Sequence, residues 1–182
     1  MKWSKFLIFS GVAAFILVEL LFPSITGPQK LPLELQAKNT AFNLNKAITA
    51  YHTEYRDYPI LDPVNDVVID SEHALMDILL GSDKQRGQDG RNPRGIAFYT
   101  DKAAKPMGGG RFRKGLTYNE KDGSGQLWDP WGNFYRVRFD TDRNGKVENP
   151  EKPGTFIPES ILTWSAGPDG DFETWEDNVK TW

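Results

Sequence analysis

The chain has 182 residues, of which 38% are hydrophobic and 13% aromatic, so a head domain of about 150 residues can bury one core once an apolar N-terminal run is set aside. It has no cysteine, which excludes disulfides, thiolate catalysis and cysteine-based zinc sites. The formal net charge is −3, but residues 140–182 hold ten carboxylates against four Lys and Arg, and this acidic end argues against a nucleic-acid partner because phosphate contacts need clustered basic side chains.

The first element in chain order is an apolar run of 18 residues at positions 6–23. That length spans a bilayer core as a helix. Lys2 and Lys5 precede the run, and by the positive-inside bias they keep the N-terminus cytoplasmic and send the remainder across the membrane. We therefore expect an uncleaved membrane anchor over residues 1–23, with Glu19 snorkelling to the interface or pairing with a neighbouring subunit. The alternative is a cleaved signal peptide, although no convincing A-x-A site follows the run.

Prolines then mark a linker over residues 24–32, since Pro28 and Pro32 interrupt any helix that continues from the membrane. From Leu33 the apolar positions recur at helical spacing and predict an amphipathic helix that ends near Asp57, before the Tyr58-Pro59 step. The head domain is thus expected to cover residues 33–182. The apolar stripe of the helix consists of Leu33, Ala37, Ala41, Leu44, Ile48, Tyr51 and Tyr55.

The middle of the chain predicts less regular structure. Residues 71–80 are typical of a short helix, with Ser71 as the N-cap and Gly81 just after the C-terminus. Residues 82–126 have no sustained period and are rich in glycine, so they are expected to be mostly loop, with a short strand at residues 96–99. This stretch carries a basic group that could contact an acidic partner or form a solvated loop; its members are Lys102, Lys105, Arg111, Arg113 and Lys114.

Regular structure is expected again from Gln126. The segment DPWG at residues 129–132 has Asp, Pro and Gly where a type I turn prefers them. Residues 133–139 alternate apolar and basic side chains, as in a strand with one buried and one solvated face, and residues 161–165 supply a further strand. The expected fold class is therefore α+β, with a long amphipathic helix packed on a small antiparallel sheet that has long loops.

The strongest local signal for a ligand follows that strand. Residues 140–151 fit the calcium-loop pattern D-x-[DN]-x-[DN]-G with an acid at the twelfth position, and their side chains supply the oxygen ligands that calcium prefers. Pro150 argues against the exiting helix of an EF-hand. The alternative is a polar hairpin with Asn144-Gly145 in a type I′ turn. The candidate ligands are Asp140, Asp142, Asn144 and Glu151.

The apolar start, the long helix ending at Tyr58-Pro59, the segment DPWGNFY at residues 129–135 and the segment SAGPDG at residues 165–170 occur in an order that resembles the major pseudopilin of type II secretion systems. The resemblance implies a pilin-like fold in a single-pass protein of the cytoplasmic (inner) membrane, with its head in the periplasm. It implies assembly with other pseudopilin subunits, through the N-terminal helices, into a short filament that helps to move folded exoproteins outward.

The resemblance also implies a structural calcium ion in the loops near the C-terminus. It carries Asp169, Glu176 and Asp177 onto the family's calcium positions, although Glu176 stands where the family usually has aspartate. The alternative for these side chains is a solvated acidic tail.

The processing motif of the family is only partly present. Residues 15–20 imitate the segment that follows its cleavage site, but Ala14 stands in place of the glycine. In the register set by Tyr58-Pro59, Met1 instead falls about where the mature family members begin. A second hypothesis is therefore a monomeric, membrane-tethered calcium-binding domain that does not enter a filament.

Catalytic chemistry has no motif in this sequence. The two histidines, His52 and His73, are not accompanied by a nucleophile elbow or a triad pattern, and the triple glycine at residues 108–110 lacks the continuation of a phosphate loop. We expect no enzymatic activity and no small-molecule substrate. A third class, an extracytoplasmic enzyme or a glycan-binding module with exposed Trp side chains, has no motif behind it.

Overall fold

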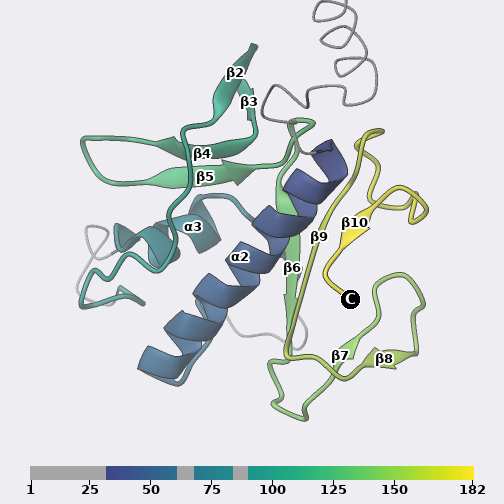
Figure 1. Ribbon diagram of the computed structural model, residues 1–182. Helices are drawn as coiled ribbons and strands as arrows, with labels where there is room; N and C mark the ends of the chain where they lie inside the picture. Colours follow the sequence, from purple (N-terminus) through teal and green to yellow (C-terminus); the bar gives the residue numbers. More distant parts are fainter. Residues whose placement is uncertain (1–31, 61–67, 84–89) are drawn as a thin grey trace, which may run out of the picture. The chain divides into compact units, whose positions relative to one another are not determined.

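The computed structural model describes residues 32–60, 68–83 and 90–182. The predicted anchor over residues 1–23 and residues 24–31 of the predicted linker lie outside this part of the chain. Over the described ranges, no helix is both long enough and apolar enough to cross a bilayer. The unit from Pro32 to Trp182 mixes one long helix with small antiparallel sheets (Figure 1), as the periodicity predicts.

The elements of this unit are mostly short, and the long helix is the exception. Their bounds, in chain order, are α2 (Leu33–Tyr55), β1 (Val68–Asp70), α3 (His73–Leu80), β2 (Lys105–Gly108), β3 (Arg111–Arg113), β4 (Gly115–Tyr118), β5 (Gly125–Trp128), β6 (Tyr135–Phe139), β7 (Val147–Glu148), β8 (Phe156–Ile157), β9 (Ile161–Ser165) and β10 (Val179–Lys180).

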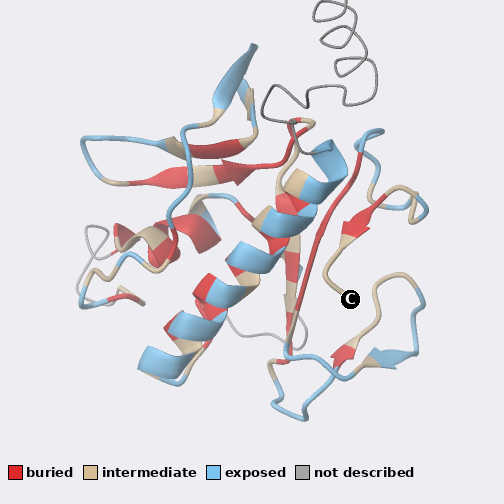
Figure 2. Ribbon diagram, viewed as in Figure 1, coloured by how far each residue is buried: buried red, intermediate tan, exposed pale blue. Residues whose placement is uncertain are grey.

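Helix α2 confirms the predicted amphipathic helix. It ends at Tyr55 because Arg56 adopts the left-handed conformation, with φ of 57°, and donates its backbone N–H to the His52 carbonyl oxygen at 2.8 Å. Buried and exposed positions alternate along the helix with helical period (Figure 2), and the middle of the predicted stripe is fully buried. The two ends of the stripe differ, since Leu33 is exposed and Tyr55 is half-buried.

The main sheet has four strands in the order β1, β6, β9, β10, and every neighbouring pair is antiparallel. Strand β9 has the predicted bounds, whereas β6 begins two residues later than predicted, because Asn133 still belongs to the preceding turn and Phe134 forms an isolated bridge with Trp128. Tyr135, Val137 and Phe139 lie in one core cluster with the buried residues of α2, and Arg136 and Arg138 occupy the opposite face of β6.

A second, smaller core covers that opposite face. It contains Leu162 and Trp164 of β9 together with Val147 of β7. The half-buried side chains that pack against it come from the β8 strand and the C-terminal segment, and they are Ile157, Phe172, Trp175 and Trp182. The sheet is therefore packed on both faces, by α2 on one side and by the β7–β8 hairpin and the C-terminal segment on the other.

Helix α3 confirms the predicted short helix but not its predicted N-cap. It begins at His73, after Glu72, and Gly81 closes it with φ of 77°. Ser71 instead joins two strands, because its Oγ donates to the Leu127 carbonyl oxygen at 2.7 Å and accepts the Tyr135 N–H at 2.9 Å. The serine is fully buried, and its hydroxyl bridges β5 and β6 instead of capping the helix.

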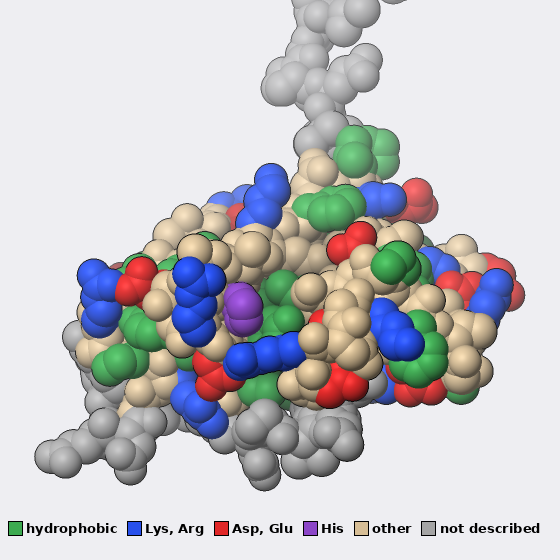
Figure 3. Space-filling model, turned by 90° about the horizontal axis from the view of Figure 1, so that it is seen from below, with side chains coloured by type: hydrophobic (Ala, Val, Ile, Leu, Met, Phe, Trp, Pro, Cys, Tyr) green, Lys and Arg blue, Asp and Glu red, His purple; other side chains and the backbone are tan. Residues whose placement is uncertain are grey.

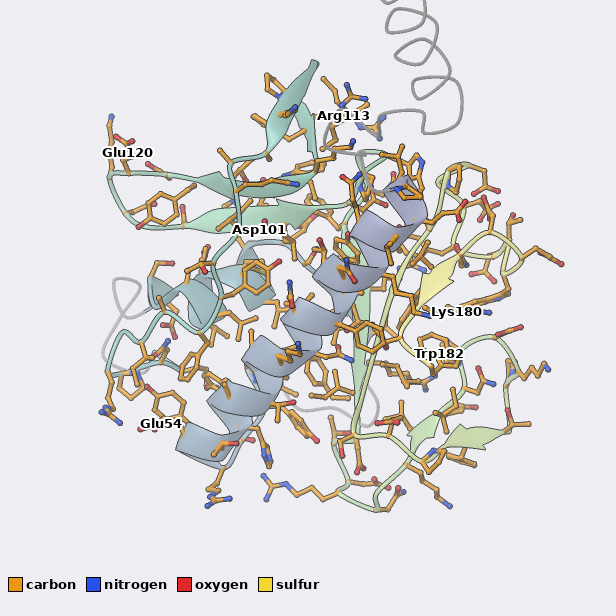
Figure 4. The ribbon with its side chains drawn as sticks, in the orientation of Figure 1. Glu54, Asp101, Arg113, Glu120, Lys180 and Trp182 are labelled. Carbon is orange, nitrogen blue, oxygen red and sulfur yellow. The ribbon has the colours of Figure 1, made fainter. Side chains whose placement is uncertain are left out.

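As predicted, most of residues 82–83 and 90–126 lie outside helices and strands, but the prediction was wrong to leave out two hairpins. This stretch contains the β2–β3 hairpin and most of the β4–β5 hairpin, with Glu120 at the tip of the latter (Figure 4). The sequence shows no strand period at β2, because all four of its residues are exposed and its side chains do not alternate between apolar and polar. The predicted strand at residues 96–99 is also wrong, since Phe98 and Tyr99 both donate to the Leu79 carbonyl oxygen instead of entering a sheet. The basic group lies on and beside the β2–β3 hairpin.

The contact between α2 and the main sheet can be tested at Ile48, which is fully buried. Ile48→Asp removes apolar packing and buries a carboxylate, so we expect it to lower the free energy of unfolding by roughly 4 kcal/mol or more. Ala50→Asp places the same side chain on the exposed face of the helix and should cost less than about 1 kcal/mol. Thermal and urea unfolding of both variants would measure the difference, and equal losses would contradict the packing.

Candidate metal centre

The turn before β6 is organised by the carboxylate of Asp129, which is fully buried. Its Oδ1 accepts the backbone N–H groups of Trp131, Gly132 and Asn133 at 2.8, 2.7 and 2.9 Å. Its Oδ2 accepts the hydroxyl of Ser165 at 2.6 Å. The segments DPWGNFY and SAGPDG, which lie far apart in the sequence, therefore share one buried hydrogen-bond centre.

The loop after β6 is held by Asp140, which is buried at the end of the strand. Its two oxygens accept the backbone N–H groups of Asn144 at 3.0 Å and Gly145 at 2.8 Å. Asp142 also accepts the Asn144 N–H, at 3.2 Å, and its Oδ2 accepts the Asn144 side-chain amide at 2.6 Å. Three of the four predicted ligands in this loop thus lie close together, but their oxygens serve backbone and amide donors.

Glu151, the fourth predicted ligand of that loop, has a different partner. Its Oε2 accepts a hydrogen bond from the ammonium of Lys180 at 2.8 Å, which ties the loop to β10. That hydrogen bond lowers the pKa of Glu151 below its ordinary value. Glu151 is therefore engaged by a cation of the chain itself and does not join Asp140, Asp142 and Asn144.

The alternative of a type I′ turn at Asn144-Gly145 is wrong. That turn needs positive φ at both residues, whereas the residues with positive φ here are Arg143, at 57°, and Gly145, at 81°. Arg143 extends instead to the end of α2, where its Nη2 donates to the Arg56 carbonyl oxygen at 3.0 Å. Its Nη2 also lies 3.6 Å from a carboxylate oxygen of Asp57. Basic and acidic side chains are interspersed over the face shown in Figure 3.

The C-terminal loop runs from β9 to β10 through a series of tight turns. Asp169 accepts the N–H of Asp171 at 2.8 Å, and Asp171 accepts the N–H of Glu173 at 2.9 Å. The loop closes on itself at Gly167, whose φ is 68° and where a Cβ would lie 2.3 Å from the Asp177 carbonyl oxygen. Only glycine fits this approach, so the start and the end of the loop are in direct contact.

Two buried oxygens of this loop accept no hydrogen bond from any residue that the structure describes. They are Asp177 Oδ1 and Asn178 Oδ1. Asn178 is only 7% exposed, and its side-chain nitrogen donates to the Phe172 carbonyl oxygen at 2.9 Å, which fixes the orientation of its amide. A buried acceptor without a donor is costly, and a hard cation such as calcium is one group that two such oxygens can satisfy.

The predicted metal ligands are thus divided between two loops. Within residues 32–60, 68–83 and 90–182, no three His, Asp or Glu side chains lie together in a group that could hold a metal ion. Asp169 and Glu176 are exposed, and the carboxylates of Asp169, Glu176 and Asp177 do not meet in such a group. A cation at Asp177 would therefore need oxygens from the amide of Asn178 and from backbone carbonyls as well.

Asn178 was not among the predicted ligands. Its type gave a weak signal, because a single Asn after two acidic residues matches no ligand spacing. Only the fold shows that its oxygen is buried beside the closing point of the loop. No family model, no curated protein and no solved structure matches this chain.

The Asp129 centre can be tested by two substitutions that differ in whether they keep an acceptor oxygen at this position. Asp129→Ala leaves three backbone N–H groups, one buried and two half-buried, and the Ser165 hydroxyl without this acceptor, so we expect it to lower the free energy of unfolding by about 3 kcal/mol or more. Asp129→Asn keeps an acceptor oxygen for the three N–H groups and should cost clearly less. Urea unfolding of both variants would measure this order, and equal losses would show that the backbone of the turn does not depend on the side chain.

The same residue predicts a component of pH dependence. Burial raises the pKa of Asp129 above its ordinary value of 3.8, although Ser165 and three backbone N–H groups oppose the shift. The folded protein then binds this proton more tightly than the unfolded chain, so the contribution of Asp129 to the free energy of unfolding falls as pH rises from 3.8 through the raised pKa. Asp129→Asn lacks this group. The difference in unfolding free energy between parent and variant should therefore change across the acidic range, and a constant difference would refute the shift.

Proposed function

We propose that the chain is a non-enzymatic, pseudopilin-like structural subunit of a type II secretion or type IV filament-like machine. In this proposal an inner-membrane anchor holds a pilin-like head in the periplasm, and calcium stabilises the C-terminal loops. The observation that carries the proposal is the hydrogen bond from Ser165 to Asp129, at 2.6 Å. It joins the two segments on which the resemblance rests into one unit, on a sheet packed against one long helix.

The exposed face of α2 supports an assembly role. Leu35 and Phe42 are exposed on this helix, at 43% and 40% of their surface. The helix follows the predicted linker directly in the sequence, so Leu35 and Phe42 are among the head residues closest in sequence to the predicted anchor. Apolar side chains on an exposed helix face are suited to packing against another helix.

The histidines have structural contacts that support a non-enzymatic role. His52 packs its ring on Tyr58, with ring centroids 5.0 Å apart, at the end of α2. His73 Nδ1 lies 3.1 Å from Asp77 Oδ1, and that same oxygen accepts the N–H of Gly125 at 3.0 Å. The Asp77 carboxylate therefore ties α3 to β5, which is a packing role.

The C-terminal loop supports the calcium part of the proposal more strongly than the loop after β6. Asp177 and Asn178 offer buried oxygens that have no donor among the described residues, whereas the oxygens of Asp140 already accept two backbone N–H groups. A calcium ion would supply positive charge to the Asp177 carboxylate in a loop that also carries Asp169 and Glu176. The ion would stabilise the folded head alone, because the unfolded chain does not hold these oxygens together.

The assembly role can be tested on the full chain by cysteine cross-linking, because the chain has no cysteine of its own. Leu35→Cys and Phe42→Cys each place one thiol on the exposed face of α2. In membranes, a bismaleimide should join each single-cysteine variant into covalent dimers, because each chain then carries one thiol. The double variant Leu35→Cys/Phe42→Cys has two thiols per chain and should give a ladder of larger species. Thr155→Cys, which is exposed near the β7–β8 hairpin, is the matched control and should yield fewer cross-links. Monomers alone at both helix positions would favour the membrane-tethered, monomeric domain instead.

The calcium role predicts a shift in thermal stability. At a hundredfold excess of calcium over its Kd the folded state should gain about 2.7 kcal/mol, so the melting temperature should rise with calcium and fall with a chelator. Asp177→Ala or Asp169→Ala should remove most of that rise if the C-terminal loop is the site, and Asp140→Ala should remove it if the loop after β6 is the site. Asp171→Ala, which loses only a turn contact, is the control.

Calorimetry supplies the contrary outcome for calcium. No heat of binding at millimolar calcium, together with melting temperatures that do not respond to the ion in any variant, would make these carboxylates a solvated acidic surface. Such a result would remove the calcium part of the proposal and leave the assembly part to the cross-linking experiment.

A further inference from the structure

A groove of about 440 Å³ lies on the face of the main sheet that α2 does not cover. Its floor comes from β1, β6 and β9, and its walls come from the β7–β8 region and the C-terminal loop. The volume is within the range of pockets that hold small ligands, which is roughly 300–1,000 Å³. The residues that matter for its chemistry are Asp70, Arg136, Arg138, Trp164, Glu173 and Trp175.

The floor of the groove is a row of side chains on paired strands. Asp70 of β1 lies opposite Arg136 of β6, and Arg136 lies opposite Trp164 of β9. Side chains that face each other across antiparallel strands are held at fixed spacing by the backbone hydrogen bonds. The groove therefore presents a carboxylate, a guanidinium and an indole in an order fixed by the sheet.

The charges on this floor are largely compensated within the protein. Arg138 Nη2 lies 2.7 Å from Glu148 Oε2, and Arg136 Nε lies 3.5 Å from Asp70 Oδ1. The guanidinium of Arg136 also stacks on the Phe172 ring, 3.8 Å from its centroid. These contacts hold both arginines in place, so the groove offers hydrogen-bond donors and acceptors side by side without a strong net charge.

One residue that lines the groove has a buried donor without a partner in the described part of the chain. Trp164 is only 2% exposed, and its Nε1–H makes no hydrogen bond there. An indole N–H taken out of water without an acceptor is costly. A ligand in the groove does not reach this nitrogen, which has less than 1 Å² of exposed surface, so Trp164 lines the groove with its ring.

We propose that this groove binds a neutral saccharide. Each hydroxyl of a sugar both donates and accepts, which matches Asp70 and Glu173 as acceptors and Arg136 as a donor. The apolar C–H face of the sugar ring would pack against the half-buried indole of Trp175. An anion would be repelled by Asp70 and Glu173, and a cation would be repelled by the two arginines. An apolar ligand would leave the polar groups of the groove unsatisfied.

This inference does not depend on the proposed assembly role, and it departs from the expectation of no small-molecule partner. It also differs from a glycan surface built on exposed Trp side chains, because none of the Trp residues within the described ranges is exposed. The ligand chemistry comes from one groove in which Trp164 is buried and Trp175 is half-buried.

The test uses the full chain labelled with ¹⁵N at Trp, in a detergent without a sugar headgroup, because a glycosidic detergent would compete for the groove. Neutral disaccharides such as maltose, cellobiose and N,N′-diacetylchitobiose are titrated to millimolar concentration. At least one of them should shift the Trp164 Nε1–H resonance in a saturable manner. Glycine and glucuronic acid serve as the zwitterionic and anionic probes, and both should shift it less.

Variants connect the signal to the groove. Trp175→Ala should weaken binding about tenfold, as expected for a lost aromatic contact, whereas Trp131→Ala, a half-buried Trp of the turn before β6, should leave it unchanged. Glu173→Gln keeps an acceptor oxygen and should change the affinity of a neutral sugar little. Unchanged thermal unfolding midpoints confirm that each variant is folded.

Three results would overturn the proposal. The first is the absence of any saturable shift with every disaccharide, and the second is tighter binding of glycine or glucuronic acid than of any neutral sugar. The third is an affinity that does not change in folded Trp175→Ala. None of these results would bear on the cross-linking ladder, so failure here and failure of the assembly role are distinguishable.

Discussion

A single buried carboxylate, that of Asp129, holds together parts of the chain that are 36 residues apart. It accepts three backbone N–H groups of its own turn and one hydroxyl from the end of β9, so the start of β6 and the end of β9 are fixed relative to each other. These two strands are also paired in register along their whole length, from Tyr135 opposite Ser165 to Phe139 opposite Ile161. The pair in turn supplies the surface on which α2 packs and the floor of the groove on the other face. Burial opposes the charge of Asp129, and its four hydrogen-bond donors offset part of that cost.

How far the sequence predicts this fold depends on whether the signal is periodic. The stripe from Ala37 to Tyr51 and the alternation in β6 have strong periods, because each element buries one face in a core, and both predictions are confirmed. The β2–β3 hairpin was missed because its strands are almost entirely exposed and carry no apolar alternation. Ser71 looked like a helix cap because serine caps and serine bridges have the same local sequence. Only the positions of Leu127 and Tyr135, more than 50 residues away, show that it bridges two strands.

The acidic loops show a similar limit. The calcium-loop pattern at residues 140–151 predicted which residue types could supply oxygens, and Asp140, Asp142 and Asn144 are indeed neighbours. The spacing of the acidic residues could not predict the hydrogen bond between Lys180 and Glu151, because Lys180 lies in a strand 29 residues away. In the C-terminal loop the pattern of acids was visible in sequence, but the buried amide of Asn178 and the contact of Gly167 with Asp177 arise only when the loop closes. Charge composition therefore locates the loop, and the fold decides which oxygens lack a donor.

The C-terminal loop matters for more than its own order, because the residues that flank it also hold α2 on the sheet. Thr163, just before the loop, donates its hydroxyl to the side-chain oxygen of Asn45 in α2. Thr181, just after the loop, accepts the backbone N–H of Thr163 at 3.1 Å and the Asn45 amide at 3.4 Å. A loop that opened between these two threonines would release Thr181 first, and Asn45 would then keep only its contacts with β9. Any group that closes the loop at Asp177, an ion included, is therefore coupled through β10 to the packing of α2 on the main sheet. In an assembly that uses the exposed face of α2, loop closure and helix presentation would be linked by these hydrogen bonds.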